Sequence, residues 1–197
     1  HAEHVAEHGP EAAVSHVLAD FLRSYDVDRV AVPPRFPLKT ADALGARGIE
    51  VAAYSDGVVT EIRATKTDEE IDHVRDTQRA NEAAMRAAEA LLREADVTEG
   101  SADPVLHHDG AVLTSERVKT EIESTLLEHG CGLDETIVAC GADAADPHDR
   151  GSGPLRPDRP IIIDIFPRSK TSGYHADMTR TFVVGDPDRT VRGWFER

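Results

Sequence analysis

Apolar side chains recur at helical spacing in three stretches of the chain and at strand-like spacing in several others. The helical stretches cover residues 11–25, 67–94 and 114–130, where apolar residues lie three and four positions apart. A shorter helix is expected at residues 41–46, ended by Gly48. Strands are expected where apolar and β-branched runs stand between turn residues, at residues 27–32, 49–54, 58–59, 135–141, 160–166 and 174–184. This order of elements predicts a mixed α/β (α+β) fold.

A change of character at Thr67 indicates a domain boundary. Thr67 and Glu70 have the spacing of a capping box, in which the threonine hydroxyl accepts from a first-turn amide and the glutamate reaches back to the first residue. We therefore place the boundary at residues 64–66. The chain is predicted to hold a small α/β unit at residues 1–65 and a second part at residues 66–197.

Charge and composition narrow the possible partners and location. The 197 residues include 37 acidic and 22 basic side chains, a formal net charge of −15. This charge argues against a protein that binds nucleic acid or an anionic membrane, because attraction to phosphate needs clustered Lys and Arg. No apolar stretch is long enough to span a bilayer.

The kinds of charged residue and the two cysteines add an expectation about the compartment. Only four of the basic residues are Lys, which suits a salt-saturated cytoplasm where ionic strength screens self-repulsion. An ordinary acidic protein from a GC-rich genome is the alternative. Cys131 and Cys140 have no CxxC spacing, which favours a reducing, cytoplasmic compartment.

The most informative chemistry is an aspartate inside an apolar run, Asp164 in residues 161–166. A buried carboxylate must be neutralised, paired or bound to metal. If residues 160–184 form a hairpin centred near Lys170 and Thr171, Asp177 lies directly opposite Asp164, with Cβ atoms about 5 Å apart. Two such carboxylates either share a proton or bind divalent cations between them. The alternative is structural: Asp164 ends its strand, and Asp177 pairs with a nearby arginine, Arg168 or Arg180.

Residues at alternate positions beside Asp177 share its face of the predicted strand. Thr179 and Thr181 are candidates to orient the Asp177 carboxylate by donating hydrogen bonds to it. His175 could line a substrate pocket on that face, or be a half-exposed strand histidine.

These residues resemble the central motif of the pita-bread metallopeptidases, the family that includes Xaa-Pro aminopeptidase, prolidase, methionine aminopeptidase and creatinase. The resemblance rests on Asp164, Gly173-Tyr174, the run Asp-Met-Thr-Arg-Thr-Phe at residues 177–182, and Gly185. Residues 67–83 are similar to the first helix of the family's catalytic domain. Residues 137–148 are similar to the strand and loop that carry its active-site histidine, which would be His148.

The resemblance implies both a fold and a site. Residues 1–65 would be the end of a creatinase-type N-terminal α/β domain, and residues 66–197 the first half of a pita-bread catalytic domain. Asp164 and Asp177 would ligate two divalent ions (Mn, Co or Zn), and His148 would contact the substrate. The implied reaction is metal-assisted hydrolysis of an Xaa-Pro peptide bond, in which the ions lower the pKa of a shared water. A peptide substrate and a homodimer are expected of the complete protein.

Two features depart from the family. The aspartates stand thirteen positions apart, more than is usual, although an added pair of residues keeps both on one face. The family completes its metal site with a later His and two Glu, and no residue follows Arg197 here. The chain begins at His1 and ends in what resembles the first turn of a helix. We therefore expect a fragment that binds metal weakly and hydrolyses nothing by itself.

Two alternative functions stay open. The first is a creatinase-like or catalytically inactive protein of the same fold, acting on another amide or only binding it. The second is a non-enzymatic α/β interaction module, in which Asp164 and Asp177 are surface charges.

Overall fold

A computed structural model describes residues 2–54, 57–97 and 103–196. The chain divides into two compact units, His1–Thr65 and Lys66–Arg197.

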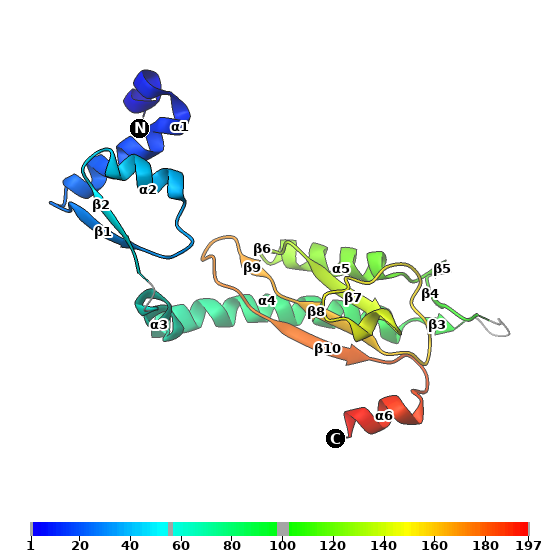
Figure 1. Ribbon diagram of the computed structural model, residues 1–197. Helices are drawn as coiled ribbons and strands as arrows, with labels where there is room; N and C mark the ends of the chain where they lie inside the picture. The colour runs from blue at the N-terminus through cyan, green and yellow to red at the C-terminus, as the bar shows by residue number, and fades with distance from the viewer. Residues whose placement is uncertain (1, 55–56, 98–102, 197) are drawn as a thin grey trace. The chain divides into compact units, whose positions relative to one another are not determined.

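The first unit is a small α/β arrangement around two parallel strands (Figure 1). Its elements are α1 (Ala2–Arg23, kinked at Gly9), β1 (Arg29–Val32), α2 (Leu38–Gly45), β2 (Glu50–Ala53) and α3 (Val58–Ala64). Its core is small: Ala19, Leu44 and Ile49 are buried. Gly48 follows α2 with φ 79°, a left-handed conformation that glycine adopts without a steric penalty.

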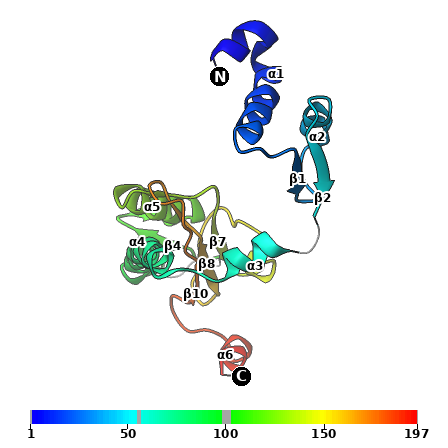
Figure 2. The ribbon, with the colours of Figure 1, turned by 90° about the vertical axis from the view of Figure 1, so that its left-hand side faces the viewer.

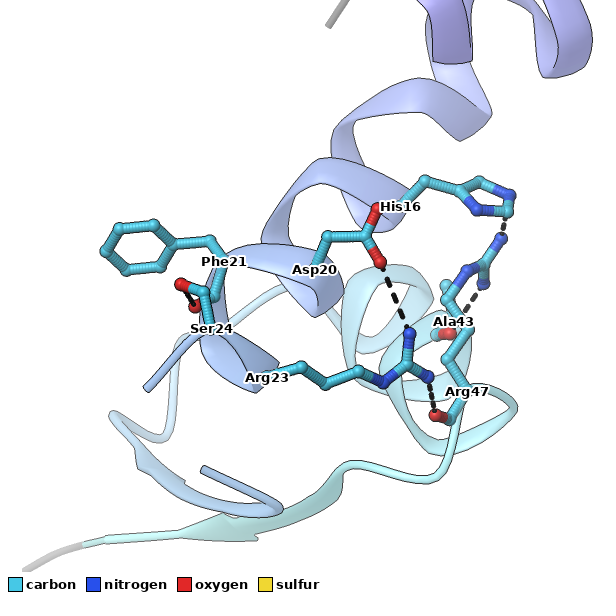
Figure 3. A network of polar contacts seen from close by, with 7 residues as sticks. All are labelled: His16, Asp20, Phe21, Arg23, Ser24, Ala43 and Arg47. Atoms are coloured by element: carbon cyan, nitrogen blue, oxygen red, sulfur yellow. Dashed lines mark hydrogen bonds and ion pairs between the residues drawn. The ribbon is translucent and has the colours of Figure 1, made fainter. Parts of the chain in front are cut away.

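Two arginines join α1 to the end of α2 (Figure 3). Arg47 contacts the ring of His16 at 2.5 Å and donates to the carbonyl of Ala43 at 2.6 Å. Arg23 donates to the backbone carbonyl of Arg47 and pairs with Asp20 at 3.3 Å. Because guanidinium groups donate in several directions, they satisfy carbonyls at the end of the short helix.

The expected strand at residues 58–59 is wrong, because these residues begin the helix α3. Gly57 at φ 70° precedes the helix, and the amide of Glu61 donates to the Gly57 carbonyl at 2.8 Å. Val59 is 65% exposed, so no packing against a sheet favours an extended conformation there. The preference of valine for strands mostly reflects packing on a half-buried surface, and Val59 has no such surface to pack against.

The second unit places two helices on one face of a three-stranded antiparallel sheet (Figures 1 and 2). The helices are α4 (Asp68–Arg93) and α5 (Ser115–Glu128), and the sheet has the order β10 (Met178–Phe182), β8 (Ile161–Ile165), β7 (Thr136–Cys140). The smaller elements are β3 (Asp96–Val97), β4 (Leu106–His108), β5 (Ala111–Val112), β6 (Cys131–Gly132), β9 (Arg168–Ser169), α6 (Arg189–Phe195) and the 3₁₀ turn η1 (Asp143–Ala145).

The expected start of α4 is confirmed. Thr67 accepts from the amide of Glu70 at 3.3 Å, and the Glu70 carboxylate accepts from the amide of Thr67 at 2.7 Å. Helix α5 also begins as expected, with Thr114 accepting from the amide of Arg117. Both helices therefore start where a local side-chain acceptor satisfies a first-turn amide.

Alternation along β8 separates the hydrophobic core from the open face of the sheet. Ile161, Ile163 and Ile165 are fully buried against the helices, while Ile162 and Asp164 point to the other face and are half-buried. Fully buried Asn81 of α4 donates to the β8 carbonyl of Ile165 at 3.0 Å. Because successive side chains alternate between the faces of a strand, the apolar run keeps its aspartate out of the core.

The hairpin register differs from the expected one by two residues. Asp164 lies opposite Thr179, not opposite Asp177. The turn is closed by Ser169 and Tyr174, whose backbone groups bond at 2.9 Å, and Gly173 inside it has φ 76°. The turn needs a left-handed residue near its end, and Gly173 supplies it. The centre of the hairpin therefore lies one position later in the chain than the expected centre near Lys170 and Thr171. A shift of two keeps Asp164 and Asp177 on the same face.

Candidate metal and substrate site

A pocket of about 280 Å³ lies on the open face of the sheet, around Asp164. Its walls come from all three strands and from the loop after β7, namely Ile137, Ala139, residues 144–147, Ile162, Asp164 and Thr179. Most of these side chains are small or apolar. Asp164 therefore presents a half-buried carboxylate to a pocket with few competing polar groups.

Asp164 is oriented by a hydrogen bond from the neighbouring strand. The Thr179 hydroxyl donates to Asp164 Oδ1 at 2.5 Å, at the short end of the range for a hydroxyl that donates to a carboxylate. The sequence predicted that Thr179 would orient Asp177, and this partner is wrong because of the register shift. Thr181 lies opposite Ile162 and is exposed. One threonine of the predicted pair thus contacts a predicted ligand.

Asp177 comes immediately before β10 and is exposed on the same face. Because Thr179 faces Asp164, Asp177 is the diagonal neighbour of Asp164, and such neighbours lie about 7–8 Å apart in an antiparallel pair. Within the described ranges, no ion pair joins Asp177 to Arg168 or Arg180. Arg168 donates to the Gly173 carbonyl, and Arg180 to the Thr179 carbonyl. The structural alternative of an Asp177–Arg pair is therefore not seen.

His148 lies in the loop whose preceding residues, 144–147, form a wall of the pocket. Its backbone amide donates to Asp146 Oδ1 at 2.9 Å, and its side chain is 93% exposed. The loop is held at Gly151, whose amide bonds the Asp149 carboxylate at 2.8 Å and whose carbonyl accepts from Lys119 at 2.7 Å. The loop thus brings His148 to the rim of the pocket rather than into it.

His175 lines a different pocket from Asp164. This second pocket has a volume of about 310 Å³ and lies over the β6–β9 pair, with walls from residues 132–134, Phe166, residues 168–170 and His175. His175 forms an isolated bridge with Arg168. His175 therefore does not line the pocket around Asp164, and its contact with substrate stays a prediction.

Sequence reasoning did not find how the hairpin is held to α4. The Tyr174 hydroxyl donates to Glu70 at 2.6 Å, and the Tyr174 ring stacks on His73 with centroids 5.5 Å apart. The hydrogen bond from Tyr174, followed by that from the Thr67 amide, lowers the pKa of Glu70 below its ordinary value. The capping box was the available signal, because one Glu70 oxygen stays free to accept from a distant donor.

The chemistry of the carboxylates fits part of a divalent metal site. Carboxylate oxygens are suitable ligands for such ions, and the Thr179 bond orients Asp164 in the way typical of outer partners of a ligand. Among the residues that the structure describes, no group of three or more His, Cys, Asp or Glu could hold a metal ion. Within the described ranges, Asp164 and Asp177 are therefore suitable in chemistry for part of such a site but do not make up a complete one.

Comparison with known proteins identifies the class. Residues 72–196 match the model of metallopeptidase family M24, and the chain belongs to this family. A curated Xaa-Pro dipeptidase from Pyrococcus furiosus is 29% identical over 143 residues, covering 72% of this chain and 36% of the relative. A probable dipeptidase PepE from Mycobacterium tuberculosis is 29% identical over 166 residues, covering 82% of this chain and 38% of the relative. The chain thus spans little more than a third of these relatives.

Solved structures show the same fold. The Xaa-Pro dipeptidase from Bacillus anthracis aligns with a TM-score of 0.69 at 19% identity, covering 93% of this chain and 47% of that one. An X-Pro aminopeptidase from Thermotoga maritima aligns with a TM-score of 0.62 at 23% identity, covering 91% and 47%. These structures support the predicted mixed α/β architecture of the pita-bread type.

None of the helices in the described ranges has the length and apolar character that a membrane span requires.

Proposed function

We propose that this chain is part of a metal-dependent peptidase that hydrolyses Xaa-Pro peptide bonds, as an aminopeptidase or a dipeptidase. The observation that carries the proposal is Asp164, held by the Thr179 hydroxyl at 2.5 Å inside a pocket on the open face of the sheet. The names of the relatives and the M24 family support the reaction class.

The residues have distinct roles in this proposal. Asp164 and Asp177 would supply carboxylate ligands to two divalent ions (Mn, Co or Zn), and such ions would lower the pKa of an attacking water. The Thr179 hydroxyl fixes the orientation of Asp164. His148, at the end of the loop that walls the pocket, donates to the carbonyl oxygen of the scissile bond as negative charge develops there.

The remaining ligands are proposed to come from the part of the fold that the relatives have and this chain does not cover. The chain matches 36–38% of the curated relatives. Two carboxylates bind a divalent ion weakly, so this chain alone is expected to bind metal weakly and to leave Xaa-Pro dipeptides intact. The preceding α/β unit at residues 1–65 favours a prolidase or Xaa-Pro aminopeptidase over a methionine aminopeptidase.

Calorimetric titration of the chain with Mn²⁺ tests the ligands. Wild type is expected to bind weakly, and Asp164→Ala and Asp177→Ala are each expected to abolish the heat of binding. Asp76→Ala, which removes an exposed carboxylate of α4 that pairs with Arg79, is the control for lost negative charge and should bind as wild type does. Unchanged binding in Asp177→Ala would overturn the assignment of the ligands. Hydrolysis of an Xaa-Pro dipeptide by the chain alone would overturn the separate expectation that this chain is inactive by itself.

A further inference from the structure

One face of α4 carries a row of polar side chains that contact the hairpin of Asp164 and Asp177. We call this row the α4 polar stripe; it consists of Glu70, His73, Thr77 and Asn81. Residues three and four positions apart lie on the same face of a helix. Thr77 is 1% exposed and Asn81 is fully buried. Because burying a polar group costs free energy unless it is hydrogen-bonded, the partners of these side chains show what the stripe holds.

The end of the stripe at Asn81 holds the first arm of the hairpin, β8. The Asn81 side-chain amide donates to the Ile165 carbonyl at 3.0 Å. Ile165 directly follows Asp164, is fully buried, and pairs with Thr136 and Met178 in the sheet. The Asn81 bond therefore fixes α4 relative to the strand that carries Asp164.

The rest of the stripe holds the second arm of the hairpin at Tyr174. The Thr77 hydroxyl lies 3.3 Å from the Tyr174 carbonyl and 3.0 Å from the His73 carbonyl, so its proton is shared between them. The Tyr174 hydroxyl donates to Glu70 at 2.6 Å. The Tyr174 ring stacks on His73 with an interplanar angle of 26°. Tyr174 is thus held on α4 both by its backbone and by the tip of its side chain.

The backbone from Tyr174 to Asp177 is held on its other side as well. The Ser169 amide donates to the Tyr174 carbonyl at 2.9 Å, and the Ala176 amide donates to the Pro167 carbonyl at 3.1 Å. Ala176 is 7% exposed. Within the described part of the chain, no hydrogen bond to the Asp177 carboxylate is seen. The place of Asp177 is therefore set by the backbone on either side of it and not by contacts of its own side chain.

We infer that the α4 polar stripe fixes the position of Asp177 relative to Asp164, which makes Thr77 and Tyr174 positioning residues for the two ligands. Asn81 and Thr77 stand one turn apart on a single helix, and each contacts a different arm of the hairpin. The spacing of the arms therefore depends on α4 as well as on the turn between them. The inference rests on the proposed function in taking the two aspartates as metal ligands.

Hydrogen exchange without metal tests the geometric part of the inference. Thr77→Val and Tyr174→Phe each remove one hydroxyl, and the second keeps the ring. In the presence of EDTA, NMR should show about two- to tenfold faster exchange of the Ala176 amide in both variants, the range for one lost hydrogen bond. Thr77→Ser keeps the hydroxyl and should exchange as wild type does. The Val138 amide, which donates to the Arg150 carbonyl, should keep its exchange rate; equal acceleration there would show a general loss of stability and overturn the inference.

Mn²⁺ affinity, measured by calorimetry, separates a positioning role from a purely structural one. Thr77→Val and Tyr174→Phe should weaken binding by about two- to tenfold, and Thr77→Ser should restore it. Thr120→Val is the matched control, because the exposed Thr120 hydroxyl also donates to the carbonyl four positions earlier, that of Glu116, at 2.9 Å; it should bind as wild type does. Faster exchange of the Ala176 amide with unchanged Mn²⁺ affinity would overturn the positioning role.

The two measurements also separate this inference from the proposed function. An absence of binding heat in wild type would count against the two aspartates as ligands, and exchange of the Ala176 amide would then decide the role of the stripe by itself. Exchange at the wild-type rate in both Thr77→Val and Tyr174→Phe would overturn the inference whatever the Mn²⁺ result.

Discussion

Gly151 anchors the loop that carries His148, and its replacement by alanine tests how the pocket wall is held. Gly151 has φ 69°, and a Cβ built there would lie 1.9 Å from the Val138 carbonyl oxygen and 2.7 Å from the Ala139 Cα in β7. Both obstacles are backbone atoms of β7, which is hydrogen-bonded to β8, so the loop must move away from β7. The amide of Val138 donates to the Arg150 carbonyl at 3.1 Å, and this bond is lost when the loop moves.

The loss of stability in Gly151→Ala has two parts, the strained backbone conformation of the alanine and the hydrogen bonds lost when the loop moves. A left-handed conformation costs a non-glycine residue about 1–2 kcal/mol. Loss of the Val138 amide bond and of the Lys119 bond to the Gly151 carbonyl adds about 0.5–1.5 kcal/mol each. Gly151→Ala is therefore expected to lower the free energy of unfolding by about 2–5 kcal/mol.

Gly153→Ala is the matched control, because it has φ 72° with nothing within 4 Å of a built Cβ. It should lose only the backbone part, about 1–2 kcal/mol. Urea denaturation followed by circular dichroism gives both free energies, and hydrogen exchange at the Val138 amide reports the local contact. Values for the two variants within about 0.5 kcal/mol of each other would refute the close-approach argument.

Three further predictions concern α5 and the pocket. Ser115→Ala removes a buried hydroxyl that donates to a β7 carbonyl at 2.8 Å, and urea denaturation should show a loss of about 0.5–1.5 kcal/mol; no loss would contradict it. The pKa of Glu116 is lowered, mainly by the Gly153 amide, so the stability of wild type relative to Glu116→Gln should be present above the ordinary value of 4.5. That difference should disappear as the pH falls through the lowered pKa, and a difference that grows in acid would contradict the assignment. Thr179→Val should weaken Mn²⁺ binding about 10–100-fold by calorimetry, because the donor to Asp164 is lost, whereas Thr179→Ser should not; equal loss in both would contradict it.

The sequence alone predicted the elements that depend on nearby residues. Helix α4 begins at Thr67 because the capping box is made within four residues, and β8 follows from an apolar run between turn residues. The sequence also indicated Asp164 as a candidate site residue, because burying a carboxylate inside such a run costs free energy unless the carboxylate has a partner. The motif from Asp177 to Phe182 indicated the family, which the match over residues 72–196 shows.

Only the tertiary structure decided how these elements meet. The left-handed Gly173 sets the turn, and the turn sets which residue faces Asp164, so Thr179 rather than Asp177 lies opposite it. The exposure of Val59 left the helix start at residues 58–59 without a sheet to pack against, and contact with the β7 backbone decided where the His148 loop lies. Local hydrogen bonds and periodicity depend on neighbouring residues. Strand register, the close approach of one backbone segment to another, and burial depend on residues that are far apart in the chain.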